Sequence, residues 1–224
     1  MGSSKSGFDE FVKTNSVSIP SYLGRLRLRT HEDDDAASCA SIFSDPISRK
    51  HLLFLQPPNG WKNAEQQWTV EDFTDRVNVQ KATRANGKSC VLNIILLAST
   101  SGEETDRCIG TTGFVTIDNE IGYLGIISDH KTTRLGYATE ALYTSIAFAF
   151  EKLGVKKIIM QTDELNEEMR GWCENTAGFK LDNKKPKELN GYSFIQYEYM
   201  FTLDEWNDSI KTRLEEKMNK IYKK

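Results

Sequence analysis

Hydrophobic residues recur along the chain with two different periods, which predict helices and strands. The clearest helical pattern covers residues 138–154, where apolar positions return every three or four residues and Gly154 follows the last of them. Such a stripe is typical of an amphipathic helix, and a glycine just past its end is a common stop. Similar spacing predicts further helices over residues 32–43, 69–87 and 166–177, and from Leu203 onward.

Short apolar runs bounded by turn residues predict the strands. They cover residues 24–30, 89–98, 107–117, 120–127, 156–162 and 191–202. Residues 89–98 are apolar on both faces, as a central strand is. Residues 45–68 follow neither period and contain the break "QPPNGW", so they predict a long loop.

The order of these elements predicts a mixed α/β fold, with one sheet and helices on both of its faces. Residues 120–162 form a strand–helix–strand unit, whose two strands must run parallel with a right-handed crossover. At 224 residues the chain is long enough for one sizeable core. We expect a flexible arm over residues 1–19 and a single domain over residues 20–224, in which residues 203–224 form a C-terminal helix.

Composition excludes several classes of function. The net charge of −3 and the pI near 5.7 predict no affinity for nucleic acid. No apolar run approaches the roughly 20 residues of a membrane span. The scattered cysteines predict reduced thiols and a cytoplasmic protein, and the histidines show no metal-ligand spacing with them, so we expect no metal.

The first residues raise a separate question. "MGSSKS" fits the pattern for myristoylation of Gly2, although we prefer the simpler explanation, a flexible start of glycine and serine, because short motifs often match by chance. We therefore expect membrane contact only if Gly2 carries the lipid.

The stretch "TTRLGYATEAL", residues 132–142, lies where a predicted strand passes into the clearest helix. The first N–H groups of a helix have no partner within it, and with the helix dipole they form a site for an anion such as a phosphate. Gly136 and Ala138 would let such a ligand approach the backbone, while Arg134 and Thr139 could add charge and a hydroxyl. A simple tight turn remains the alternative.

Together with its surroundings, this stretch resembles the GNAT superfamily of acetyl-coenzyme A-dependent N-acetyltransferases. The resemblance is greatest to the branch that includes the ribosomal-protein N-terminal acetyltransferases, and it is most specific at "GYATEAL", at Asn166 and at Gly178-Phe179. The phosphate loop of the family, (Q/R)-x-x-G-x-(G/A), falls on residues 133–138. Thr133 departs from the pattern, because the arginine comes one place later.

The resemblance implies a mostly antiparallel sheet in which one parallel pair of strands, 120–127 and 156–162, splays apart around acetyl-coenzyme A. The pantetheine arm would pair with the backbone at Ile126 and Ile127, and Asn166 would contact the arm. The pyrophosphate would bind the loop residues Thr133, Arg134, Leu135, Gly136, Tyr137, Ala138 and Thr139.

The resemblance also suggests catalytic and acceptor-binding residues, each with a simpler alternative. Glu120 would accept the proton of the acceptor amine through water, or is merely an exposed acid beside a turn. Cys173 stands near the place of a tyrosine that protonates the leaving thiolate, or is a small buried residue. Phe54 and Trp61 would line the acceptor pocket, or pack the loop down.

The sequence thus predicts an enzyme that moves acetyl from acetyl-coenzyme A to a primary amine, either a small molecule or a protein N-terminus. The alternative is a degenerate member of the same fold that binds an acyl-coenzyme A, or a protein, without catalysis. The apolar stripe of the last helix leaves both a monomer and a homodimer open.

Overall fold

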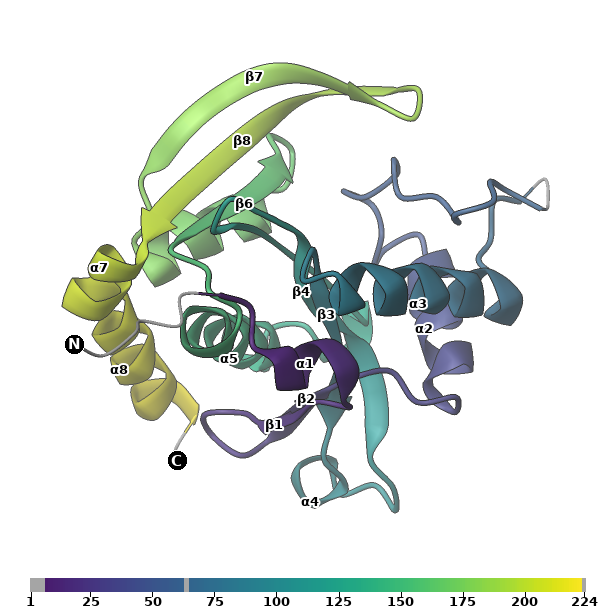
Figure 1. Cartoon of the computed structure of the whole chain (residues 1–224), viewed down its shortest axis with the longest axis horizontal. Coiled ribbons are helices and arrows are strands. Elements are labelled where there is room, and N and C mark those ends of the chain that lie inside the picture. The colour runs from purple at the N-terminus through teal and green to yellow at the C-terminus, as the bar shows by residue number, and fades with distance from the viewer. Residues whose placement is uncertain (1–6, 63–64, 223–224) are drawn as a thin grey trace.

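The computed structural model describes residues 7–62 and 65–222, and it is built around one eight-stranded sheet (Figure 1). The strands are β1 (Ser18–Pro20), β2 (Leu26–Arg29), β3 (Cys90–Leu96), β4 (Arg107–Asp118), β5 (Ile121–Ser128), β6 (Lys157–Asp163), β7 (Leu181–Leu189) and β8 (Tyr192–Thr202). Their spatial order is β1-β2-β3-β4-β5-β6-β8-β7. The pair β5–β6 is parallel and the other neighbours are antiparallel, which confirms the predicted mixed sheet.

Helices cover both faces of this sheet, as the element order predicts. They are α1 (Glu10–Thr14), α2 (Asp35–Ser44), α3 (Val70–Ala85), α4 (Ala98–Ser101), η1 (His130–Thr132), α5 (Tyr137–Lys152), α6 (Glu167–Gly171), η2 (Trp172–Ala177), α7 (Leu203–Glu205), η3 (Trp206–Ile210) and α8 (Lys211–Tyr222). Two apolar clusters result, one around α5 and one around α2 and α3. Strand β3 contributes to both, since Ile94 joins the first cluster and Ile95 the second.

The C-terminal helical stretch packs on its own domain. Trp206, Leu214 and Met218 carry its apolar stripe, and all three are buried in the cluster around α5. Much of that stripe is therefore used within the chain. Among the residues that the structure describes, no helix is both long and apolar enough to cross a membrane.

The expectation of a flexible arm over residues 1–19 is wrong for the part of it that is described. Val12 and Val17 are buried, and the Arg84 guanidinium donates hydrogen bonds to the carbonyls of Val12 and Asn15, at 3.2 and 2.8 Å. Isolated apolar residues among polar ones show no period, so the pattern did not indicate this packing. Gly2 lies outside the described residues.

Strand β7 was not predicted. Each of its residues is exposed, so it carries no alternation of apolar and polar positions, and its pairing with β8 alone makes it a strand. The turn between the two strands contains Asn190 and Gly191, both with positive φ. An Asn-Gly pair is a strong hairpin signal, and it could have revealed the hairpin.

Candidate active site

Strands β5 and β6 separate part-way along their length. Their pairing runs from Ile121 opposite Lys157 to Leu124 opposite Met160. Beyond that point β5 continues to Ser128 on β4 alone, and β6 continues to Asp163 on β8 alone. The two strands thus leave an opening in the sheet, at the place where the sequence predicts a splayed pair.

The loop that follows β5 ends in a helix start without a side-chain cap. Gly136 is the N-cap residue of α5, with φ +80°, and no side chain bonds to the first N–H groups of the helix. Arg134 also has a positive φ, +62°, and is exposed together with Leu135 and Ala138. Unpartnered N–H groups at a helix start favour an anion, and the exposed face of Ala138 leaves room for one.

Other predicted loop residues face inward or are already engaged. The Thr133 hydroxyl donates to the His130 carbonyl at 2.9 Å, and the Thr139 hydroxyl accepts from Trp172 Nε1 at 3.0 Å. Tyr137 is buried. These three side chains build the loop, so the groups open to a ligand are the backbone and the Arg134 side chain.

Asn166 follows the free end of β6, across the opening from this loop. Its Oδ1 accepts from the Met169 N–H at 3.1 Å and so caps α6. On the facing strand, Ile126 is half-buried, whereas Ile127 is buried among residues of α2 and α3 and offers a ligand only its backbone. The structure therefore brings the loop, the end of β5 and Asn166 together around one opening.

Comparison with known proteins identifies the family. The family profile described as the acetyltransferase (GNAT) domain matches residues 25–180. The chain belongs to the GNAT family. It is by that membership an acetyl-CoA-dependent acetyltransferase.

Individual relatives agree with this membership. An N-acetyltransferase called p20 from Bacillus licheniformis is 28% identical over 172 residues, which are 76% of this chain and 83% of that protein. The structure of Mycobacterium smegmatis RimJ with a coenzyme A disulfide superposes with a TM-score of 0.71 at 18% identity, over 91% of this chain and 94% of that one. RimL, a ribosomal-protein alpha-N-acetyltransferase, gives a TM-score of 0.66 at 14% identity, over 84% and 95%.

Glu120 lies at the paired end of β5 in this acetyltransferase, before the strands separate. It occupies the turn between β4 and β5 with φ +63°, is exposed, and its Oε1 is 2.8 Å from Lys156 Nζ. Four residues of strand, roughly 13 Å, separate it from Leu124, where the opening begins. The structure thus does not bring Glu120 into contact with the loop of residues 133–139.

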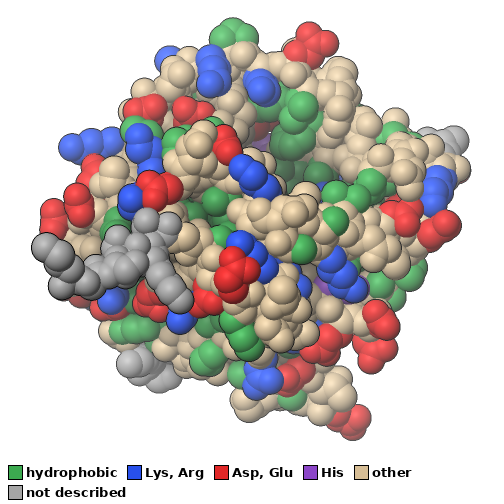
Figure 2. Space-filling view, in the orientation of Figure 1, with side chains coloured by type: hydrophobic (Ala, Val, Ile, Leu, Met, Phe, Trp, Pro, Cys, Tyr) green, Lys and Arg blue, Asp and Glu red, His purple; other side chains and the backbone are tan. Residues whose placement is uncertain are grey.

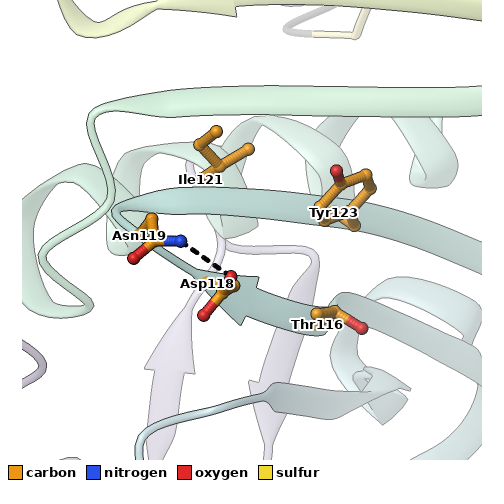
Figure 3. Close-up of a pocket in the computed structure, with 5 residues that line it drawn as sticks. All are labelled: Thr116, Asp118, Asn119, Ile121 and Tyr123. Carbon is orange, nitrogen blue, oxygen red and sulfur yellow. Dashed lines mark hydrogen bonds between the residues drawn. The ribbon is translucent and has the colours of Figure 1, made fainter.

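A groove of about 380 Å³ runs beside Glu120 on the surface of β4 and β5 (Figure 3). Its lining residues are Thr116, Asp118, Asn119, Ile121 and Tyr123. Asn119 Nδ2 donates to Asp118 Oδ2 at 2.9 Å and closes the groove at the turn. The lining of the groove ends at Tyr123, which is still paired with Ile159 of β6, one residue before the last pair of the two strands.

Cys173 does not face the opening, which corrects its assignment as a catalytic acid. It is completely buried in the cluster around α5. Burial raises the pKa of the Cys173 thiol far above its usual range, and the neighbouring Glu174 carboxylate acts in the same direction. A side chain enclosed in this way cannot contact a leaving thiolate, so its role is to fill the core.

The loop between α2 and α3 spans from the end of β5 to the β7–β8 hairpin. Near its start, Asp45 Oδ1 lies 3.0 Å from His130 Nδ1, beyond the end of β5. Farther along, the Phe54 ring stacks on Phe194 of β8 at 5.7 Å, and Asn190 Nδ2 donates to the Phe54 carbonyl at 2.7 Å. The loop therefore reaches from the β5 side of the opening to the β8 side.

The surface is hollowed below the hairpin, with hydrophobic side chains along the wall (Figure 2). Phe54 belongs to this neighbourhood through its contact with the hairpin. Trp61 instead packs edge-on against Trp68, at 6.2 Å, and under the Arg49 guanidinium. The two aromatic residues predicted to line one pocket therefore have different neighbours, because the loop between them follows the surface of α3.

Two polar residues beside the opening, Gln161 and Glu198, were not predicted from the sequence. Gln161 is the first residue of β6 beyond the paired segment, and its Nε2 donates to Glu198 Oε2 of β8 at 2.5 Å. The Glu198 side chain is only 14% exposed, with Lys185 Nζ at 3.9 Å. Their proximity depends on the register of β6 against β8, which no local pattern indicates.

His51 lies in the loop that reaches across the opening. Burial lowers the pKa of His51, the charge of Lys50 lowers it further, and the carboxylates of Asp163 and Glu168 oppose the change. Asp163 and Glu168 flank Asn166, so this imidazole belongs to the same end of β6. Within the described part of the chain, no group of histidine, cysteine and acidic residues is arranged to hold a metal ion.

Proposed function

We propose that this acetyltransferase moves an acetyl group from acetyl-coenzyme A to a primary amine by direct transfer. The observation that carries the proposal is the opening between β5 and β6 next to the uncapped start of α5. A strand edge without a partner can pair with an amide-bearing ligand, and helix N–H groups can bind its pyrophosphate. Coenzyme A carries both groups.

The residues around the opening fit the coenzyme. The backbone of Ile126 and Ile127 would pair with the pantetheine arm, Asn166 would contact it from the side of β6, and residues 133–139 would hold the pyrophosphate. Bound acetyl-coenzyme A supplies an activated acetyl group. The cofactor-bound neighbour RimJ, which shares the fold, supports this placement.

The acceptor would approach from the groove and the hollow beneath the hairpin. Its nitrogen must lose a proton to attack the thioester, because an amine with a pKa near 8–10 is mostly protonated at pH 7. Glu120, at the end of the groove, would take this proton through water. Glu198 is a second carboxylate on that side of the sheet, nearer to the opening.

Two acceptor classes fit this site, a protein N-terminus and a small amine. The neighbour RimL is a ribosomal-protein alpha-N-acetyltransferase, and this favours testing N-terminal peptides first. Phe54 would then contact the first side chains of the peptide, since its ring stacks on Phe194 of the hairpin.

The test is a transfer assay with labelled acetyl-coenzyme A against N-terminal peptides and small amines. We expect label in at least one acceptor and release of free thiol in equal amount. Binding of acetyl-coenzyme A without transfer to any acceptor would favour the degenerate alternative, a binding protein of the same fold. The ion pair of Glu120 with Lys156 is the observation that keeps this alternative open.

A further inference from the structure

A buried carboxylate lies one turn inside α5, behind the proposed pyrophosphate site. The Glu140 side chain has no exposed surface. Its Oε1 accepts from Ser21 Oγ at 2.5 Å, from the Leu23 N–H at 3.0 Å and from the Arg25 N–H at 3.3 Å. Its Oε2 accepts from Arg25 Nε at 2.8 Å. Glu140 thus fixes residues 21–25, the turn between β1 and β2, against the helix.

Arg25 also contacts the loop of residues 133–139, where the pyrophosphate is proposed to bind. Its Nη1 donates to the Leu135 carbonyl at 3.0 Å, and its guanidinium carbon lies 4.8 Å from the centre of the Tyr137 ring. Leu135 and Tyr137 are the two neighbours of Gly136. One side chain therefore holds the loop on both sides of its glycine.

The backbone conformation of the 133–139 loop requires such contacts. Arg134 and Gly136 both adopt the left-handed region, which for a residue other than glycine costs free energy and persists only where surrounding contacts enforce it. Leu135 is half exposed, so core packing does not hold it in place. The bond from Arg25 to the Leu135 carbonyl supplies a fixed point between the two unusual residues.

The charge of Glu140 gives a second reason why the site needs Arg25. Glu140 follows Gly136 by four residues, about one helical turn, so its carboxylate is close to any anion bound at the helix start. Buried charges are little screened by salt, and an isolated carboxylate there would repel a pyrophosphate. The Arg25 guanidinium, directly bonded to Glu140, cancels that charge.

We propose that Arg25, held by Glu140, is a positioning residue that keeps the 133–139 loop in the conformation that binds the coenzyme pyrophosphate. This inference rests on the proposed binding of acetyl-coenzyme A. Arg25 acts through the loop backbone and through the charge of Glu140, so its contribution belongs to coenzyme affinity. The acceptor side of the site, across the opening, should be indifferent to it.

The test compares Arg25→Gln with a matched control four residues farther along, at the end of β2. Arg29→Gln also breaks a shielded ion pair, since Arg29 Nη1 is 2.6 Å from Asp35 Oδ2. The two arginines are similarly shielded, because the Arg29 side chain is 16% exposed and the Arg25 side chain 19%. Arg29 contacts Asp35 of α2 and Glu32, which precedes that helix, and not the loop of residues 133–139. Both variants should be less stable than the wild type, but only Arg25→Gln should bind coenzyme A more weakly.

We expect Arg25→Gln to raise the calorimetric Kd for coenzyme A by about 3- to 30-fold at a temperature where circular dichroism shows each variant folded. The KM for acetyl-coenzyme A should rise in parallel, while kcat at saturation and the KM for the acceptor stay within about twofold. Adding Glu140→Gln to Arg25→Gln should recover part of the affinity, because the unpaired carboxylate is then gone. Arg25→Lys, which keeps the charge but cannot make all the contacts, should fall in between and serves if Arg25→Gln does not fold.

Equal Kd values for the wild type, Arg25→Lys and Arg25→Gln would overturn the inference alone. So would an equal rise in Arg29→Gln, because the effect would then reflect stability. A wild-type protein without measurable affinity for coenzyme A would overturn the proposed function, and this inference with it.

Discussion

At the scale of single residues, two carboxylates are candidates for the base that would take the proton of the acceptor amine. Glu120→Gln should lower kcat by at least about tenfold near pH 7, because a positioned general base typically contributes about 10²–10⁴-fold. The loss should shrink as rising pH deprotonates the amine in solution. Rates across a pH series with a saturating acceptor measure this, and the Kd for coenzyme A should not change.

Glu198→Gln is the matched control for that measurement. If it carries the loss while Glu120→Gln keeps full activity, the base is the carboxylate beside the opening and our assignment of Glu120 is incorrect. Cys173→Ala should affect stability more than turnover, since its thiol lies in the core.

A residue-scale prediction about stability concerns His31. Burial lowers the pKa of His31, while Asp35, whose Oδ2 is 3.9 Å from Nδ1, opposes the change. Asn93 Nδ2 lies 3.1 Å from the same nitrogen, as suits a neutral ring. The pKa of His31 in the folded protein is thus below the unfolded value of about 6.5. The contribution of His31 to stability is therefore fully present above a pH of about 6.5 and is lost as pH falls through the folded pKa.

Urea denaturation of wild type and His31→Asn between about pH 7.5 and about pH 5 tests this. The free energy of unfolding of the wild type should fall with pH more steeply than that of the variant, by up to about 1.4 kcal/mol per pH unit. Parallel curves would mean that His31 does not contribute to the pH dependence.

At the scale of elements, the proposed binding of the coenzyme depends on the start of α5. Gly136→Glu places a side chain and a negative charge where the pyrophosphate is proposed to bind. Loss of even one charge-assisted hydrogen bond corresponds to about 10- to 100-fold in affinity, so the Kd for coenzyme A should rise by at least that much. Isothermal calorimetry measures the change.

Gly191→Glu is the control for backbone strain. Gly191 has φ +81°, close to the +80° of Gly136, and a side chain there meets open space at the hairpin tip. Both variants therefore carry a similar conformational cost, of about 1–3 kcal/mol. Coenzyme affinity that survives in Gly136→Glu would place the pyrophosphate elsewhere. An equal loss in Gly191→Glu would mean that backbone strain, and not the occupied site, lowers the affinity.

At the scale of the whole molecule, coenzyme binding should appear as stability. Acetyl-coenzyme A at about 100 times its Kd should add about 2.7 kcal/mol to the free energy of unfolding. For a domain of this size that is a rise in Tm of about 5–10 °C, which a thermal melt resolves. NAD and ATP at the same concentration serve as controls, and an unchanged Tm with all three ligands would contradict the proposed function.

The sequence by itself determined the elements and their order. The stripe from Ala138 to Leu153 and the run of β3, apolar on both faces, predict their structures because burial acts on residues a few positions apart. The strand–helix–strand unit required a parallel pair, and Gly136 marked the start of α5. These features are local, so periodicity and turn chemistry are enough to find them.

Only the tertiary structure decided which distant residues meet. Arg25 contacts Leu135, Glu198 lies beside Gln161, and Phe54 stacks on Phe194. It also packed Val12 against the core and enclosed Cys173. Each of these outcomes depends on strand register and on the path of a long loop, and both are set by the summed packing of the whole chain. A hydrogen bond between residues more than 100 positions apart leaves no period in the sequence, which is why the supports of the site became visible only in the fold.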